Sequence, residues 1–158
     1  MSGEITNAPQ VRIIAADPQV DLRVHYHTVL PALGYKLLTP AAGTGRELIE
    51  QCRQHGPDLV IADCKLPDVD VVDAAEEVCQ ARRVPFIVTA EHFDPQQIRR
   101  SGADHFWAYL MKPISRGHLE TVIPFVLHRF RKIQAFFQEL ESLRLQAKSG
   151  PCFQPEVG

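Results

Sequence analysis

The fold is decided by Pro57-Asp58-Leu59-Val60-Ile61-Ala62-Asp63-Cys64-Lys65-Leu66-Pro67-Asp68, a stretch near the middle of a 158-residue chain. Four apolar residues follow its polar start and stop abruptly at Asp63. A short apolar run that holds Val and Ile and is bounded by turn residues is typical of a fully buried parallel strand. Pro67 cannot continue a central strand, because it has no amide hydrogen. The stretch therefore predicts that Asp63 lies at the carboxyl edge of an open α/β sheet, where ligands bind.

The composition is that of an ordinary globular protein with a single domain. Hydrophobic residues make up 45% and charged residues 23%, and the formal net charge of −2 argues against a general polyanion-binding surface. The four cysteines include no CxxC pair, so we expect reduced thiols rather than disulfides or a metal site. The sequence has no apolar signal core and no apolar run of membrane-spanning length. We therefore expect a cytoplasmic protein without a membrane partner.

Buried-strand patterns alternate with amphipathic helix patterns along the chain. Apolar runs predict strands, and apolar residues recurring every three or four positions predict helices. The predicted strands are residues 11–16, 35–39, 59–63, 85–89 and 106–110, and the predicted helices are residues 22–33, 43–55, 72–79, 95–100 and 116–146. This alternation predicts a parallel sheet with helices on both faces. Residues 1–10 and 148–158 are expected to form a disordered lead-in and tail.

Charged and polar side chains collect where these strands end. Asp17 follows the first strand, Asp63 the third and Lys112 the fifth, while Thr89 ends the fourth. Two carboxylates, a hydroxyl and an ammonium at one edge suit phosphoryl transfer to a carboxylate. Asp63 would attack phosphorus, Lys112 would offset the charge of the transferred group, and the Thr89 hydroxyl would donate a hydrogen bond to it. The alternative that Asp17 is only a loop or cap residue stays open.

On these residues, the chain resembles the receiver domain of bacterial two-component response regulators, over roughly residues 10–125. The resemblance rests on motifs at the strand ends, which are Asp63 with Leu66-Pro67, Thr89-Ala90, Tyr109 and Lys112-Pro113. It implies a flavodoxin-like fold, a doubly wound five-stranded parallel sheet with strand order 2-1-3-4-5. The receiver domain would occupy residues 11–128.

The resemblance also implies a role for each matching residue. The position of Asp63 accepts a phosphoryl group from a histidine kinase or a phosphotransfer protein, and the position of Lys112 contacts that group. Thr89 and Tyr109 hold the positions of the family's switch pair, although Tyr109 could equally be a core residue. Mg²⁺ would bind through Asp17, Asp63 and the backbone carbonyl of Lys65.

Two positions depart from the family's pattern. Receivers usually end the first strand with a pair of acids, whereas Ala15-Ala16-Asp17-Pro18-Gln19 holds one acid, so we expect weak Mg²⁺ binding. The family generally has Gly eight positions after the phosphorylated Asp, where this chain has Val71. A β-branched residue is unfavourable there if its φ is positive, which predicts a different loop. Slow phosphorylation and none at all are both compatible with the sequence.

The last predicted helix is longer than a receiver needs, and its apolar residues follow a heptad spacing. The heptad has Ile123, Phe130 and Phe137 at a, and Leu119, Val126, Ile133 and Leu140 at d. We expect the domain to end near Phe130 and residues 129–147 to form a coiled-coil-like extension, as in ANTAR-type regulators. The predicted dimer seam is Phe130, Ile133, Phe137 and Leu140. The alternative is a helix that folds back on its own domain.

These patterns favour a response regulator that accepts a phosphoryl group on its own aspartate and acts as a phosphorylation-controlled switch for protein interaction and dimerisation. We expect no other enzymatic activity. One alternative is a pseudo-receiver scaffold that is not phosphorylated. Another is a truncated antiterminator-like RNA-binding regulator, since the chain ends before an RNA-binding output would fit. The basic cluster at His128-Arg129 and Arg131-Lys132 lacks interleaved surface aromatics, so nucleic acid is the less favoured partner.

Overall fold

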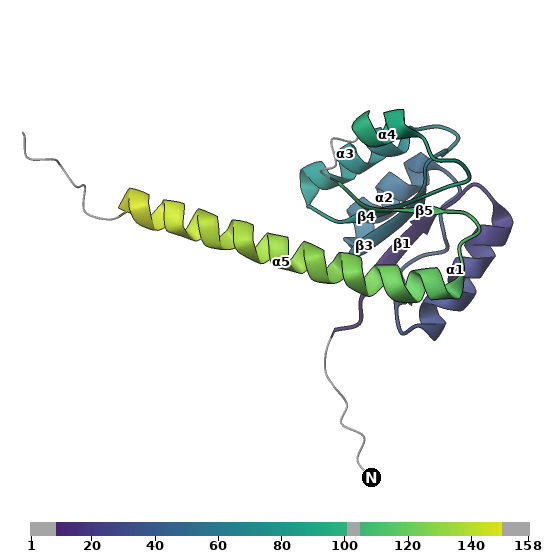
Figure 1. The fold of residues 1–158 in the computed structure, drawn as a ribbon, viewed down its shortest axis with the longest axis horizontal. Helices are drawn as coiled ribbons and strands as arrows, with labels where there is room; N and C mark the ends of the chain where they lie inside the picture. The colour runs from purple at the N-terminus through teal and green to yellow at the C-terminus, as the bar shows by residue number, and fades with distance from the viewer. Residues whose placement is uncertain (1–8, 101–104, 150–158) are drawn as a thin grey trace, which may run out of the picture.

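A computed structural model describes residues 9–100 and 105–149. They form a parallel sheet with helices packed on both of its faces (Figure 1). Most of the predicted lead-in and tail, residues 1–8 and 150–158, lies outside the described residues. Within the described ranges, every helix is too short or too polar to cross a lipid bilayer.

The described sheet has five strands in the order β2-β1-β3-β4-β5, and every pairing is parallel. The strands are β1 (Arg12–Ala16), β2 (Lys36–Leu37), β3 (Leu59–Asp63), β4 (Phe86–Ala90) and β5 (Phe106–Met111). The predicted flavodoxin-like order is thus confirmed. All residues of β3 are buried, which explains why its sequence is a continuous apolar run rather than an alternating one.

Different helices cover the two faces of the sheet. The helices are α1 (Val20–Ala32), α2 (Gly45–His55), α3 (Val71–Ala81), α4 (Pro95–Arg100) and α5 (Arg116–Ser149). Residues of α1 and α5 belong to one core cluster, and residues of α2 and α3 belong to the other. Figure 1 shows α1 and α5 on the same side of the sheet, with the second half of α5 projecting away from the domain.

Strand alternation decides toward which helices each buried side chain points. In β3, Leu59 and Ile61 pack with α1 and α5, whereas Val60 and Ala62 pack with α2 and α3. Because successive side chains point to opposite faces of a strand, Asp63 continues the row of Leu59 and Ile61. The carboxylate at the end of β3 therefore points to the side of α1 and α5.

Element boundaries differ from the predicted ones where local chemistry intervenes. β2 is restricted to Lys36–Leu37 instead of residues 35–39, because Pro40 follows closely and has no N–H to extend the ladder. The second helix begins at Gly45, because the Thr44 hydroxyl accepts a backbone N–H of the first turn and caps the helix. Neither difference moves the carboxyl edge of the sheet.

Candidate functional site

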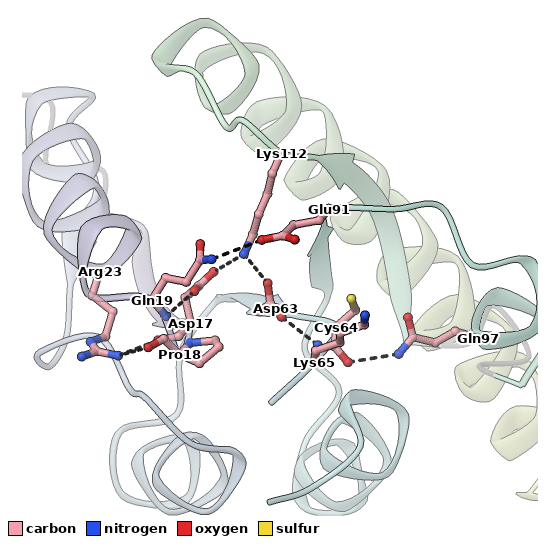
Figure 2. Close-up of polar contacts among 10 residues, drawn as sticks. All are labelled: Asp17, Pro18, Gln19, Arg23, Asp63, Cys64, Lys65, Glu91, Gln97 and Lys112. Carbon is pink, nitrogen blue, oxygen red and sulfur yellow. Dashed lines mark hydrogen bonds and ion pairs between the residues drawn. The ribbon is translucent and has the colours of Figure 1, made fainter. Parts of the chain in front are cut away.

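Three charged residues at the carboxyl edge of the sheet form an ion-pair cluster. Lys112, which follows β5, reaches both Asp17 after β1 and Asp63 at the end of β3 (Figure 2). The Lys112 Nζ lies 3.0 Å from Oδ2 of Asp17 and 2.5 Å from Oδ2 of Asp63. The cluster forms because parallel strands end at the same edge of their sheet. The structure thus brings together the three charged residues that the sequence placed there.

The two carboxylates of this cluster are shielded from solvent and ion-paired with Lys112. Asp17 exposes 0% of its surface and Asp63 exposes 4%. Their remaining oxygens accept backbone hydrogen bonds, Oδ1 of Asp17 from the Gln19 N–H at 2.8 Å and Oδ1 of Asp63 from the Lys65 N–H at 2.7 Å. Buried charges are tolerated when they are paired and hydrogen-bonded. Asp17 therefore belongs to the ion-pair cluster in addition to its local turn.

Burial and pairing act in opposite directions on the pKa values of the cluster. Burial raises the pKa of the Asp17 carboxyl, and the Gln19 N–H and the Lys112 ammonium oppose this rise only in part. Burial also acts to lower the pKa of Lys112, but its bonds to Asp63 and Asp17 outweigh burial and raise that pKa. The lysine therefore stays charged, while the charged form of Asp17 is disfavoured in the folded protein.

Asp17→Asn should stabilise the fold at neutral pH. An acid whose pKa is raised by folding contributes stability below its unfolded pKa, near 3.8, and that contribution is lost as the pH rises through the folded pKa. At pH 7 the variant removes the disfavoured charge, while Asp63 still pairs with Lys112. We expect a gain in unfolding free energy on the order of 1 kcal/mol. Thermal denaturation should show the gain at pH 7 and a smaller one at about pH 4; lower stability of the variant at pH 7 would contradict the assignment.

An open cavity of about 120 Å³ gives access to Asp63. Its lining comes from the loops at the carboxyl edge and consists of Pro18, Gln19, Asp63, Cys64, Lys65, Glu91, His92 and Lys112. Gln19 and Glu91 meet beside it, where the Gln19 amide donates a hydrogen bond to the Glu91 carboxylate at 3.2 Å (Figure 2). Arg23 braces the same loop by donating to the carbonyl oxygens of Asp17 and Pro18. The cavity is wide enough for a small anionic group to reach Asp63.

Oxygen donors suited to Mg²⁺ are present at this edge, with one carboxylate fewer than a paired-acid site has. Asp17 and Asp63 both lie within reach of the Lys112 ammonium, and Lys65 lines the cavity beside Asp63. Hard oxygen ligands of this kind match Mg²⁺, which keeps several waters. Among the described residues, no group of three or more His, Cys, Asp or Glu is arranged to hold a metal. Any such ion would therefore depend on two carboxylates and a backbone carbonyl.

Comparison with known protein families identifies the family to which this chain belongs. The family described as the response regulator receiver domain matches residues 13–124. The chain belongs to this family. This receiver domain is 33% identical over 146 residues to the transcriptional regulatory protein PdtaR of Mycobacterium tuberculosis, an alignment that covers 90% of this chain and 71% of that relative.

Other comparisons agree with the receiver assignment. The polar-differentiation response regulator DivK of Brucella anthropi is 29% identical over 113 residues, which cover 68% of this chain and 87% of that protein. Among solved structures, a CheY-like response regulator receiver domain protein from Methanospirillum hungatei has a TM-score of 0.72 at 22% identity, and the likeness covers 78% of this chain and 98% of that chain. At that identity the structural likeness confirms the fold alone.

The two residues at the family's switch positions point to opposite sides of the sheet. Thr89 is fully buried and is the register partner of Asp63. Tyr109 packs against the core cluster of α2 and α3, and its ring meets Phe93 edge-on with 6.0 Å between centroids. Thr89 thus lies where the sequence placed it, beside Asp63. The position of Tyr109 suits either a core residue or a switch residue.

Val71, the second departure from the family pattern, causes no backbone strain. It is the buried first residue of α3 and follows the N-cap residue Asp70, so its φ is helical and negative. The loop before it is fastened by Asp68, whose carboxylate accepts the N–H groups of Gly45 and Arg46 at the start of α2. These bonds lower the pKa of Asp68 despite some desolvation. The loop therefore needs no glycine at position 71.

The domain contacts the part of α5 that holds the predicted seam. Phe130 meets Trp107 edge-on with 5.4 Å between ring centroids, and Ile133 lines a crevice with both rings. The Arg83 guanidinium lies 5.4 Å from the centroid of the Phe137 ring. Part of the predicted seam therefore contacts its own domain, through Trp107 of β5 and Arg83 before β4. The expectation that the domain ends near Phe130 stays a prediction.

Phe137 of the predicted seam is itself 50% exposed, and further exposed apolar residues of α5 lie on a neighbouring face of the helix. Phe136, Leu140 and Leu143 expose 59%, 42% and 55% of their surface. Together with the half-buried Ile133, they recur at intervals of 3, 4 and 3 residues, which is again a heptad spacing. We call Ile133, Phe136, Leu140 and Leu143 the outer seam. It shares Ile133 and Leu140 with the seam predicted from the sequence.

Tyr26 is a site residue that the sequence pattern does not reveal. In the sequence it is only one member of the apolar face of α1, and the structure buries it completely. Burial raises the pKa of its phenol, and the charges of Asp17 and Asp63 raise it further. One feature of the sequence could have revealed it: Tyr26 adds a hydroxyl to a helix face whose other buried residues, Val29 and Leu30, are aliphatic.

Proposed function

We propose that this receiver domain accepts a phosphoryl group on Asp63 and thereby changes its contacts with protein partners, including a second copy of itself. The observation that carries the proposal is the buried ion-pair cluster beside an open cavity. Asp63 is the carboxylate of this cluster that lines the cavity, whereas Asp17 is fully buried. A phosphoryl donor can therefore reach Asp63 while Asp17 and Lys112 supply the charges around it.

In the proposed reaction, a carboxylate oxygen of Asp63 forms a bond to phosphorus as the bond from phosphorus to the donor breaks. The donor is a phosphohistidine of a histidine kinase or phosphotransfer protein, or a small acyl phosphate, and it leaves with the bonding electron pair. The product is an aspartyl phosphate. Lys112 is placed to offset the added negative charge, and Thr89 to donate its hydroxyl proton to a phosphoryl oxygen. The protein would turn over no other substrate.

Mg²⁺ is proposed to bind weakly through Asp17, Asp63 and the Lys65 carbonyl, where it would offset charge on the transferred group. The carboxylate that the family usually adds would come from a residue beside Asp17. Ala16 packs in the core cluster of α2 and α3, on the other face of the sheet from Asp63. Pro18, in contrast, lines the cavity. Position 18 is therefore the place where an added acid should act.

Pro18→Asp should tighten Mg²⁺ binding on the order of 10-fold, because a further charge within a few ångströms attracts a divalent ion even in a partly solvated site. Calorimetric titration of the full chain with MgCl₂ measures the affinity. The matched control is Gln96→Asp, which adds the same charge at an exposed position of α4 and should leave the affinity unchanged. Equal affinities for wild type and Pro18→Asp would remove the missing-acid explanation.

We further propose that the outer seam pairs with the outer seam of a second copy in a parallel coiled coil. In this register Ile133 and Leu140 occupy a, while Phe136 and Leu143 occupy d. Glu139 then stands at g and Arg144 at e of the following heptad, so a parallel copy places these opposite charges together. The seam predicted from the sequence offers no such pair at the same positions. Charge complementarity thus supports a second copy of this chain as the partner.

Intact-mass measurement after incubation with acetyl phosphate and Mg²⁺ tests the phosphoryl-acceptor proposal. We expect the wild-type chain to gain the mass of one phosphoryl group and to lose it slowly by hydrolysis. A chain that stays unmodified while another receiver domain in the same reaction is phosphorylated would instead support the pseudo-receiver scaffold.

A further inference from the structure

The phenol of Tyr26 is a buried polar group that the proposed phosphoryl chemistry does not use. Tyr26 comes from α1 and exposes 0% of its surface. Its ring belongs to the core cluster that contains Ala15, Ile61 and Ile87. Among the described residues, its hydroxyl has no partner in strict hydrogen-bonding geometry. A buried hydroxyl without a partner costs free energy, so its retention here calls for a physical role.

Strand alternation places the site residues on the same side of the sheet as Tyr26. Ala15, Ile61 and Ile87 share a core cluster with it. Two positions later in the sequence come Asp17, directly after β1, and Asp63 and Thr89, within β3 and β4. Side chains two residues apart point to the same face of a strand. The phenol therefore lies on the same side of the sheet as the Asp63 carboxylate and the Thr89 hydroxyl.

The Thr89 hydroxyl is a second unpaired group on this side of the sheet. Thr89 exposes 0% of its surface, and its Oγ1 has no partner in strict hydrogen-bonding geometry within the described ranges. Among the described residues, the buried hydroxyls without a hydrogen-bond partner on this side of the sheet are those of Tyr26 and Thr89. Tyr109, the aromatic residue at the family's switch position, packs in the opposite core layer. Tyr35 borders Thr89's side of the sheet but is only half-buried, so the fully buried tyrosine on that side is Tyr26.

The phenol is kept in its neutral form. Burial raises its pKa, the charges of Asp17 and Asp63 raise it further, and the nearby Thr89 hydroxyl lowers it by a smaller amount. A neutral phenol has one proton to donate. The Thr89 hydroxyl likewise has one proton and two oxygen lone pairs.

We propose that Tyr26 is a positioning residue, whose hydroxyl donates a hydrogen bond to Oγ1 of Thr89 and so directs the Thr89 proton toward the phosphoryl group on Asp63. This inference rests on the proposed function. When Thr89 turns toward a phosphoryl oxygen, its own proton is used and its oxygen is free to accept from Tyr26. Each hydrogen bond in such a chain polarises the next one, which strengthens the contact to the anion.

Tyr26→Phe removes the hydroxyl and keeps the buried ring. We expect the variant to fold with unchanged or higher thermal stability, because an unpaired buried hydroxyl is lost. Its affinity for beryllium trifluoride, a phosphoryl mimic, should fall about 2- to 10-fold at saturating Mg²⁺, the effect of one neutral hydrogen bond. Calorimetric titration measures this affinity. The control Tyr35→Phe removes the hydroxyl of a half-buried tyrosine of the same core cluster and should bind like wild type.

A double-mutant cycle separates positioning from a general effect on the core. In a Thr89→Val background the Tyr26→Phe change should no longer alter the affinity, because the hydroxyl that links phenol and phosphoryl group is absent. An equal loss in both backgrounds, no loss in either, or tighter binding by Tyr26→Phe would overturn the positioning role. If wild type binds no mimic, the proposed function fails and this inference with it; if wild type binds and Asp63→Asn does not, the cycle judges Tyr26 alone.

A spectroscopic experiment tests the same proposal with Tyr26 in place, and so does not require Tyr26→Phe to fold. The chain has three tyrosines, so Tyr35→Phe with Tyr109→Phe leaves Tyr26 as the sole one. Binding of the mimic should shift its near-ultraviolet band to longer wavelength as the phenol begins to donate a hydrogen bond. Adding Thr89→Val should abolish the shift, and a shift that persists without the Thr89 hydroxyl would refute the link.

Discussion

Asp63→Asn is expected to abolish phosphorylation by acetyl phosphate, and intact-mass measurement should find no phosphoryl adduct on that variant. The amide has the shape of the carboxylate but is far too weak a nucleophile to attack phosphorus. Asp63 is also the cluster carboxylate that the open cavity reaches, with Lys112 2.5 Å from its Oδ2. We therefore expect the change to remove the reaction, rather than to slow it by a small factor.

Two further variants serve as controls for this result. Asp73→Asn changes an exposed acid in the first turn of α3 and should be phosphorylated like wild type. Asp17→Asn leaves the acceptor in place, so any adduct it forms should still map to Asp63 by peptide mass. An adduct that survives in Asp63→Asn would assign the acceptor role to another residue.

Leu140→Glu is expected to dissociate the proposed dimer, because it places a charge at the centre of the outer seam. Leu140 also belongs to the seam predicted from the sequence, so the substitution tests dimerisation by either register. Full burial of Phe136, Leu140 and Leu143 would contribute about 1.5–3 kcal/mol per side chain. Association itself costs about 4–15 kcal/mol, so we expect a dimer with a dissociation constant near micromolar. The charge should weaken it by at least about 100-fold, an effect of roughly 3 kcal/mol.

Two further substitutions distinguish the registers by sedimentation of the full chain. Phe136→Glu should disrupt the outer seam, whereas Phe137→Glu should act less on assembly, because Phe137 already contacts Arg83 of its own domain. Gln138→Glu adds the same charge at an exposed position of α5 outside both seams and serves as the control. A wild type that stays monomeric at high concentration would refute the dimer. Stronger dissociation by Phe137→Glu than by Phe136→Glu would favour the seam predicted from the sequence over the outer seam.

The pairing of charges tests whether the two helices of the coiled coil run parallel. Glu139→Arg or Arg144→Glu alone should weaken the dimer, and the two changes together should restore it, because the exchanged charges again face each other in a parallel pair. Each exposed pair contributes well under about 1 kcal/mol, so the restoration should be partial and should diminish at high salt.

The sequence by itself determined the sheet and its edge chemistry. Apolar runs such as Leu59–Ala62 can be satisfied only by burial on both faces, and acids cannot lie inside such strands without large cost. These two facts place Asp17 and Asp63 at the carboxyl edge, and the structure has them there with Lys112 between them. The strand order was expected only from the family resemblance, and the structure has that order.

Tertiary structure alone decided which surfaces remain after packing. A heptad spacing states which residues of α5 share a face, but not which of them its own domain covers, since that depends on Trp107 and Arg83 from distant parts of the chain. The helical φ of Val71 also depends on where α3 begins, which Asp70 fixes as the N-cap. The position of Tyr26 on Thr89's side of the sheet depends on how α1 lies across β1, β3 and β4. Sequence spacing describes faces of single elements, whereas contact between elements is set by the packing of the whole domain.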